Sequence, residues 1–441
     1  MSSCSVSVTA APSQVQPRSR VLLGLIGLCL CYWGSGPLAN VLLHDRQLRD
    51  FLQEWTSARN WQAGRPVYQD MAESIPFHLP KSRAGELQFN PHPPAAVLVA
   101  LPFRSLDYRG SLLAWNAVSL ALIVIAIRNL TGRIGYSLTI FEQLFVGGLV
   151  ACSSVLKSQV LYGQLNGVLL LLLAGAWLAQ RHQWPSGAGF CIGLAVSIKL
   201  FPAFLLLFFV ARREWRAVIV AAVTMIAANG IALSVLGAEA FRDYVLVVMP
   251  QAGRFCDTWP NASLLGFLTR LFDGTFGNVS PLVRVPVLAK VLWLSLSAIG
   301  VVLTWRTTAR NRSLPGSDLA FAAWTMLMLL VSPITWDHYF LLAIPVLLAL
   351  WRDERRDASD SAVAPVSKLF LLGATLILVE LSPYSIWKYL VPGFAKSGMT
   401  PSIGTPWQLL TMISIQFYVC VAVFFACWRR VPQATPQTSD H

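Results

Sequence analysis

The chain of 441 residues is 55% hydrophobic and only 12% charged, with a formal net charge of +13. Soluble domains carry about 25% charged residues, so this composition and the repeated apolar runs argue against a soluble protein and predict an all-α membrane protein. The runs are too long for barrel strands, which alternate over about 10 residues. Arg and Lys stand in short clusters between the runs, as the positive-inside rule predicts, which argues against nucleic-acid binding.

The apolar runs predict a polytopic transmembrane bundle of about 12 helices. We expect a disordered cytoplasmic tail over residues 1–20, one integral membrane domain over 21–430 and a second cytoplasmic tail over 431–441. A large polar loop, 44–94, should follow the first helix, and a second outer loop should span 237–284. Helices are expected at 21–43, 111–127, 138–156, 167–179, 187–210 (broken at Lys199 into two), 217–236, 285–305, 319–331, 339–351, 368–381 and 407–427.

The Arg clusters predict the orientation of the chain. When the helices alternate across the membrane, one face receives Arg20, Arg128, Arg181, Arg212, Arg306, Arg352 and Arg429. That face should be cytoplasmic, because short loops rich in Lys and Arg stay inside. The opposite, extracytoplasmic face then receives Asp50, Lys157, Lys199, Asn261 and His338. The prediction depends on the break at Lys199, because an unbroken span would reverse every later loop. We therefore expect a multi-pass protein of the bacterial plasma membrane.

The first outer loop concentrates acids in a chain that is otherwise poor in charge. Asp50 lies just beyond the first apolar run, where partial desolvation raises the pKa of a carboxyl toward a value useful to a general base. Glu54 follows one helical turn later and shares that face. Lys199 lies inside an apolar stretch, where a cation is costly and marks function. The alternatives are an ordinary solvated loop acid for Asp50 and a snorkelling side chain for Lys199.

Other polar residues fall on the same outer face. Gln164 and Asn166 flank a helix start and are expected to hydrogen-bond hydroxyl groups, with helix capping as the alternative. His338 ends a Ser-Pro-Ile-Thr-Trp-Asp-His turn, and His92 precedes two prolines that make a rigid turn. Arg254, in the second outer loop, is a candidate phosphate or headgroup ligand. We find no phosphate-binding loop, dinucleotide fingerprint or metal-ligand spacing, so no cofactor and no metal are expected.

Taken together, these stretches resemble the bacterial integral-membrane glycosyltransferases of the GT-C fold. The resemblance is to glycosyltransferase family 87, which includes polyprenol-phosphate-mannose-dependent mannosyltransferases. It covers about residues 45–345. The matching stretches are Asp50-Phe51 with Trp55, His92-Pro93-Pro94, Tyr162-Gly163-Gln164-Leu165-Asn166, Lys199-Leu200-Phe201-Pro202, Asn261-Ala262-Ser263-Leu264 and Ser332-Pro333-Ile334-Thr335-Trp336-Asp337-His338.

The resemblance implies an inverting transfer of mannose, or a similar hexose or pentose, from a polyprenyl-phosphate donor to a hydroxyl of a lipid or glycan. Asp50 would be the catalytic base. Asp45 stays open as an alternative, because Glu54 stands where family members often have Tyr. The substrate-binding residues would be Lys199, His338, Arg254, Gln164, Asn166, His92, Glu54 and Asn261. A transporter or lipid flippase is the alternative function, since broken helices also mark transport sites.

Overall fold

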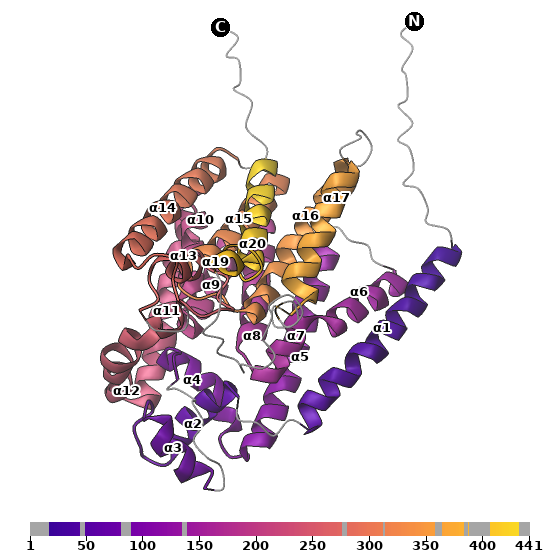
Figure 1. Ribbon diagram of the computed structural model, residues 1–441. Coiled ribbons are helices and arrows are strands. Elements are labelled where there is room, and N and C mark those ends of the chain that lie inside the picture. The colour runs from indigo at the N-terminus through magenta and orange to yellow at the C-terminus, as the bar shows by residue number, and fades with distance from the viewer. Residues whose placement is uncertain are drawn as a thin grey trace, which may run out of the picture.

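The computed structural model describes residues 17–44, 49–80, 90–134, 139–275, 280–311, 314–357, 364–382, 387 and 406–431. Over these ranges every regular element is helical and there are no strands, which confirms the all-α prediction (Figure 1). The expected tails fall largely outside the described residues, as does Asp45.

Long apolar helices identify a membrane protein. Among the described residues, five stretches are long and apolar enough to cross a membrane, and a bent pair of helices makes a possible sixth. Side chains such as Ile226 on α11 are exposed on these helices, as expected for a surface that faces lipid. The remaining apolar helices are shorter, so the total of about 12 spans stays a prediction. The long helices are α1 (Pro17–His44), α5 (Tyr108–Ile134), α11 (Trp215–Leu236), α14 (Pro286–Arg310) and the stretch made by α19 (Pro406–Leu410) and α20 (Ile415–Arg430).

The predicted break at Lys199 is confirmed. Helix α9 (Pro185–Ile198) ends directly before Lys199, whose backbone is extended at φ −141° and ψ 138°. The 3-10 helix η2 (Phe201–Leu205) then begins, with Pro202 in its first turn, and leads into α10 (Leu206–Ala211). Proline is well tolerated in the first turn of a helix, because the N–H that it lacks would have no acceptor within the helix there.

The helix expected over 138–156 is instead two helices, so this single-helix prediction is wrong. Helices α6 (Ile140–Cys152) and α7 (Ser154–Tyr162) meet at an angle of 57°. Ser153 between them is extended, and its hydroxyl accepts a hydrogen bond from the Leu156 N–H at 3.2 Å. This N-cap starts a new helix within an apolar run that otherwise looks continuous. The bend directs α7 and the following Gly163, which has φ +65°, toward the outer loops.

The two loops that the sequence predicts on the outer side, called the outer loops below, are folded into short helices that lie together. The first contains α2 (Phe51–Gln62), α3 (Met71–His78) and α4 (Pro94–Ala100), and the second contains α12 (Ala238–Asp243), η3 (Tyr244–Val248), η4 (Met249–Phe255) and α13 (Leu264–Phe272). The Trp61 indole N–H donates to the Val235 carbonyl at 2.8 Å, which joins α2 to α11. Figure 1 shows α2, α3, α4 and α12 gathered at one end of the molecule.

At the end of the molecule opposite to these short helices, ion pairs join the long helices to one another. Asp318 on α15 (Leu314–Val331) accepts from the guanidinium groups of Arg181 and Arg352 and from the Trp177 indole. These contacts join α15 to α8 (Asn166–Arg181) and α16 (Ile344–Asp357). Arg430, at the end of α20, donates to Glu354 on α16 at 2.9 Å. Arg181, Arg352 and Arg430 therefore share one end, as the orientation prediction requires.

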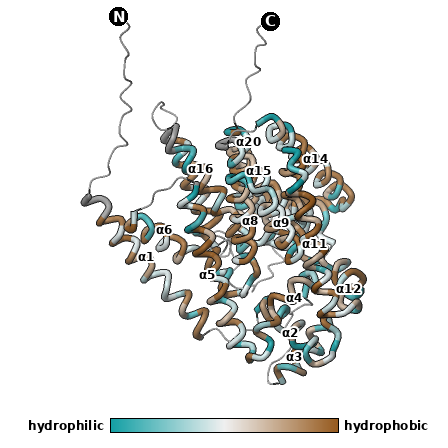
Figure 2. The backbone as a smooth tube through the Cα atoms, turned by 180° about the vertical axis from the view of Figure 1, so that it is seen from behind, coloured by the Kyte–Doolittle hydropathy of each residue, from teal (hydrophilic) through white to brown (hydrophobic). Residues whose placement is uncertain are grey.

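The remaining helices complete this arrangement. They are η1 (Leu101–Phe103), η5 (Asp337–Ala343), α17 (Ala364–Thr375) and η6 (Leu376–Glu380). The run expected at 339–351 begins as the 3-10 helix η5, and the run expected at 368–381 ends as the π-helical turn η6. Figure 2 shows hydrophilic residues gathered at the ends of α16 and α20 and, at the other extreme, on α2 and α3, with mostly apolar helices between.

Candidate active site

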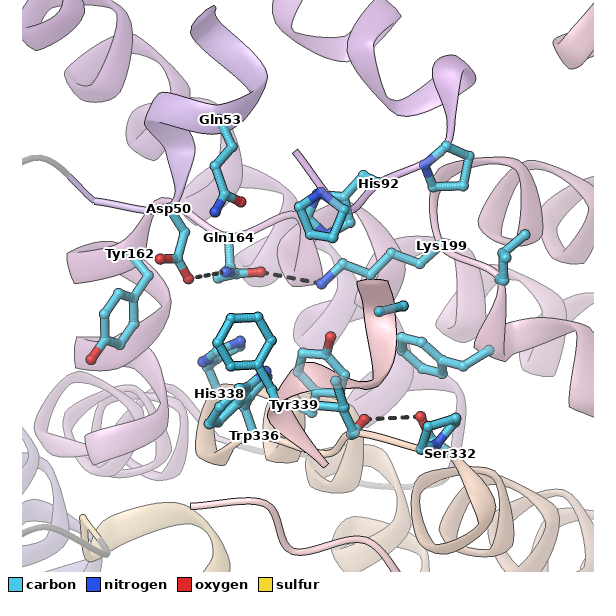
Figure 3. A pocket seen from close by; sticks show the side chains of 18 of the residues that line it. Asp50, Gln53, His92, Tyr162, Gln164, Lys199, Ser332, Trp336, His338 and Tyr339 are labelled. Atoms are coloured by element: carbon cyan, nitrogen blue, oxygen red, sulfur yellow. Dashed lines mark hydrogen bonds between the residues drawn. The ribbon is translucent and has the colours of Figure 1, made fainter. Parts of the chain in front are cut away.

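A cavity of about 560 Å³ lies where the outer loops meet the broken helix (Figure 3). Its wall is built from the start of α2, the turn at 91–93, the end of α7, the break after α9, the η3–η4 segment and the turn at 332–339. Five of the predicted site residues line this wall: Asp50, His92, Gln164, Lys199 and His338. Segments that are far apart in the sequence thus bring these side chains into one site.

Asp50 stands at the N-cap of α2 but does not cap it with its side chain. Its Oδ2 accepts a hydrogen bond from the Gln164 side-chain amide at 2.7 Å instead. Burial raises the pKa of Asp50, while the nearby His338 and the Gln164 hydrogen bond act in the opposite direction. A carboxylate that is costly to keep ionised and faces a cavity has the properties of a general base.

Lys199 is a buried cation held by neutral acceptors. It is 3% exposed, and its Nζ donates to the Gln164 Oε1 at 3.1 Å and to the Asn166 Oδ1 at 3.3 Å. The ammonium also lies 4.5 Å from the centre of the Tyr339 ring. Within the described part of the chain, no carboxylate forms an ion pair with it. Because a buried charge is costly without a partner, this site is suited to receive an anion.

Gln164 and Asn166 hold the charged groups in place. Gln164 joins Asp50 to Lys199 through the two ends of one amide, as the dashed lines of Figure 3 show. Asn166 donates to the His338 carbonyl at 3.2 Å and accepts from Lys199, so it stands behind the cavity wall. Its side chain makes no capping bond at the start of α8, where the N-cap is Leu165. The capping alternative is therefore wrong for Asn166.

Asp337 and His338 form a second charged group across the cavity. The Asp337 side chain accepts from the Ser158 hydroxyl and from the backbone N–H of His338, each at 2.8 Å. Burial by itself would raise the pKa of Asp337, but the hydrogen bonds and charge of His338 and the Ser158 bond hold it below its usual value. The His338 Nδ1 lies 3.3 Å from the Asp337 carboxylate, and its Nε2 has no hydrogen-bond partner in the described ranges. The ring is thus positioned to meet a ligand.

Sequence reasoning did not assign roles to Ser158 and Asp337. The adjacency of Asp337 to His338 was the signal available for the pair. Ser158 contacts Asp337 across 179 positions of sequence, which no local pattern predicts.

His92 and Glu54 form a carboxylate–imidazole pair. The His92 Nδ1 is hydrogen-bonded to the Glu54 carboxylate, and Glu54 is only 3% exposed. The prediction that Glu54 shares a helix face with Asp50 fits its electrostatic effect on Asp50, yet its direct partner is His92. His92 lines the cavity, and Glu54 lies behind it.

Two other predicted ligands lie away from the cavity wall. Arg254 is exposed on η4, whose residues Gln251 and Phe255 line the cavity. Asn261 is fully buried, and its side chain donates to the Pro333 carbonyl and accepts from the Thr335 N–H, each at 2.9 Å. Asn261 therefore fixes the turn that carries His338. In the ranges that the structure describes, no three His, Cys, Asp or Glu side chains gather as metal ligands do.

Comparison with known proteins points to one family. The sequence model of glycosyltransferase family 87 matches residues 90–333, which is more than half of the 441 residues. The polyprenol-phosphate-mannose-dependent alpha-(1-2)-phosphatidylinositol pentamannoside mannosyltransferase of Mycobacterium tuberculosis is 28% identical over 326 residues, covering 72% of this chain and 68% of the relative.

Two further relatives differ in the reactions that their names give. The polyprenol-phosphate-mannose-dependent alpha-(1-2)-phosphatidylinositol mannoside mannosyltransferase of Mycolicibacterium smegmatis is 25% identical, covering 76% of this chain and 78% of its own. An alpha-(1->3)-arabinofuranosyltransferase of Corynebacterium glutamicum is 29% identical, covering 49% of each chain.

Proposed function

Because the chain belongs to glycosyltransferase family 87, we propose that it transfers a sugar from a polyprenyl-phosphate donor to a hydroxyl of a lipid or glycan acceptor. The sugar is mannose or a similar hexose or pentose, since the relatives include mannosyltransferases and arabinofuranosyltransferases. The observation that carries the proposal is Lys199, a buried ammonium without a carboxylate partner among the described residues, in the same cavity as Asp50.

The reaction follows from this pair of charges. Asp50 takes the proton of the acceptor hydroxyl, and the oxygen attacks the anomeric carbon from the side opposite the phosphate. The bond between that carbon and the phosphate oxygen breaks, the electron pair leaves with the phosphate, and the configuration inverts. Negative charge grows on the phosphate during this step, so Lys199 and an Nε2–H of His338 stabilise the transition state more than the bound donor.

The donor's lipid chain requires an apolar exit from the cavity. Leu200 lines the cavity and is 50% exposed, and the lining residue Met249 is 45% exposed. Leu246 on the adjoining η3 is 68% exposed. These side chains support an opening toward lipid, where the prenyl chain lies while its phosphate reaches Lys199. Arg254, exposed on the neighbouring η4, is suited to meet the acceptor headgroup.

The reaction takes place on the extracytoplasmic side of the plasma membrane. The end of the molecule that holds Arg181, Arg352 and Arg430 supports a cytoplasmic assignment, because basic residues near short loops stay inside. The cavity is built from the outer loops at the opposite end. A polyprenyl-phosphate sugar suits that side, since it supplies an activated sugar without a soluble nucleotide.

The test is transfer by the purified protein in nanodiscs. Radiolabelled polyprenyl-phosphate mannose and polyprenyl-phosphate arabinofuranose are each supplied with membrane lipids as acceptors, and labelled products are separated by thin-layer chromatography. We expect one donor to yield a labelled glycolipid or glycan with wild-type protein and none with Asp50→Asn. Reconstituted vesicles that move the labelled donor across the bilayer without any sugar transfer would overturn the proposal in favour of a flippase.

A further inference from the structure

His92 is fixed in its loop through both its backbone and its ring. The backbone N–H of His92 donates to the Asn90 side chain at 3.0 Å, and its backbone carbonyl accepts from the Tyr68 hydroxyl at 2.7 Å. Pro91 and Pro93 restrict the backbone on both sides. The backbone is therefore fixed without help from Glu54. The buried contact between Glu54 and the His92 Nδ1 fixes the ring instead.

The contact with Glu54 determines which ring nitrogen faces the cavity. An ionised carboxylate only accepts hydrogen bonds, so the Nδ1 of His92 carries a proton. Its Nε2 has no partner among the described residues, and the ring lines the cavity. A carboxylate fixes metal-binding imidazoles in the same way, so that the far nitrogen faces the ligand; toward an anion that nitrogen has to carry a proton as well. Keeping a nearly buried carboxylate for this purpose is costly, which indicates that the ring orientation serves a ligand.

Resting on the proposed function, we propose that Glu54 is a positioning residue and that the His92 Nε2–H donates a hydrogen bond to the phosphate of the polyprenyl donor. His92 lines the same cavity as Lys199, and Glu54 acts electrostatically on that ammonium. Glu54 thus offsets the repulsion between two cationic donors. Because Nδ1 already carries the proton that faces Glu54, an Nε2–H requires a second proton on the ring, which the ring takes from solvent as the phosphate binds. The bound phosphate then lies between this Nε2–H and the Lys199 ammonium, with Glu54 on the far side of the ring.

The charges around the ring fit an anion rather than a hydroxyl. Glu54 on α2 contacts His92, Asp50 at the N-cap of α2 interacts with it electrostatically, and Lys199 lies at the break after α9. Asp337 and His338 form their own pair on η5. The phenols of Tyr68 and Tyr244 pack beside the turn. When the leaving phosphate gains its second negative charge, an Nε2–H donor strengthens its hydrogen bond, while an Nε2 lone pair would be repelled.

Two isosteric variants separate the two ends of the ring. In His92→Asn the side-chain amide overlays Nδ1, so the contact with Glu54 is kept and the reach into the cavity is lost. In His92→Gln the amide overlays Nε2, so the reach is kept and the contact with Glu54 is lost. The probe is farnesyl phosphate, a short prenyl monophosphate, whose affinity is measured by its inhibition of donor binding. The KM of the acceptor is measured in parallel.

We expect His92→Asn to weaken farnesyl phosphate binding about 10- to 100-fold, the usual range for a hydrogen bond to a charged group, and His92→Gln to weaken it less. Glu54→Gln should resemble a mild form of His92→Asn, and it should cost nothing further when combined with His92→Gln. The acceptor KM should not change in any variant. Thermal unfolding checks that each protein is folded.

Three results would overturn the inference. The first is unchanged binding of farnesyl phosphate by both His92→Asn and Glu54→Gln. The second is a raised acceptor KM with unchanged donor affinity, which would assign the ring to the acceptor hydroxyl. The third is His92→Asn outperforming His92→Gln, which would make the Glu54 contact structural. In each case wild-type transfer that is lost in Asp50→Asn would leave the proposed function standing.

Discussion

Replacing Asp50 with Asn is the most direct test of the chemistry. The change keeps the size of the side chain, and the remaining carbonyl oxygen still accepts the hydrogen bond that Gln164 donates at 2.7 Å. The change removes the negative charge and, with it, the ability to take a proton. General-base catalysis contributes about 10²–10⁴-fold, so we expect kcat to fall by that factor while donor affinity is kept.

The same substitution should lower activity but leave the fold as stable as wild type or more stable. Burial raises the pKa of Asp50, so the folded protein holds this proton more tightly than the unfolded chain does. The carboxyl therefore stabilises the fold at acidic pH, and this contribution is lost as the pH rises through the raised pKa. At neutral pH the ionised group is a cost, and Asp50→Asn should unfold at the same or a higher temperature than wild type. For the same reason, wild-type kcat/KM should fall on acidification at a higher pH than an ordinary aspartate would give.

The assay measures initial rates of sugar transfer in nanodiscs from pH 5 to 9, with donor binding measured separately. Asp70→Asn is the matched control, because this exposed loop acid caps α3 through a bond that Asn reproduces. Asp45→Asn, outside the described residues, and Glu54→Gln complete the set. Wild-type rates in Asp50→Asn, beside an inactive Asp45→Asn, would move the base five residues back. Full activity in all of them would refute a catalytic carboxylate in this loop.

Three further predictions concern the donor site, the orientation and the end of the molecule that holds Asp318. Lys199→Met should lower kcat/KM for the donor about 10–100-fold with little loss of stability. The control Lys157→Met, which replaces an exposed lysine of α7, should match wild type. Equal donor kinetics in the two variants would reject the assignment of Lys199 to the phosphate. A cysteine at Arg310 should resist a membrane-impermeant maleimide in intact cells, and labelling from outside would contradict the orientation. Asp318→Asn should lower stability by about 3–5 kcal/mol, seen as a reduced unfolding temperature, because it removes the buried carboxylate that accepts from both Arg181 and Arg352.

Run length and single polar residues were enough to predict much of the fold. The break at Lys199 was predictable because a cation and a nearby proline both oppose a continuous apolar helix. The bend at Ser153 was not, because serine is common inside apolar helices and becomes a cap only when the backbone turns there. The helices of the outer loops were missed because they are short and amphipathic and are stabilised by packing rather than by their own sequences.

The candidate site, like the fold, was predictable only in part. Asp50, Lys199 and His338 stood out because charge is rare in this chain and each falls on the predicted outer face. Their partners were hidden because the contacts join distant segments: Glu54 and His92 are 38 positions apart, and Asp50 and Gln164 are 114 apart. Asn261 shows the limit of assigning roles from polar residues alone, since its side chain bonds to the turn at 332–335 and to its own loop.

Gln164 explains how an acid and a cation share one small cavity without neutralising each other. If Lys199 contacted Asp50 directly, the ion pair would favour the ionised carboxylate and weaken it as a base, and it would occupy the ammonium that a phosphate needs. The amide prevents this, because its N–H donates to the carboxylate while its oxygen accepts from the ammonium. The reverse orientation is excluded by charge, since it would set an oxygen against the carboxylate and an N–H against the ammonium. The proposed base and the proposed anion site are therefore separated by one side-chain amide and its two hydrogen bonds, of 2.7 and 3.1 Å, so that each group faces the cavity with its charge unpaired by the other.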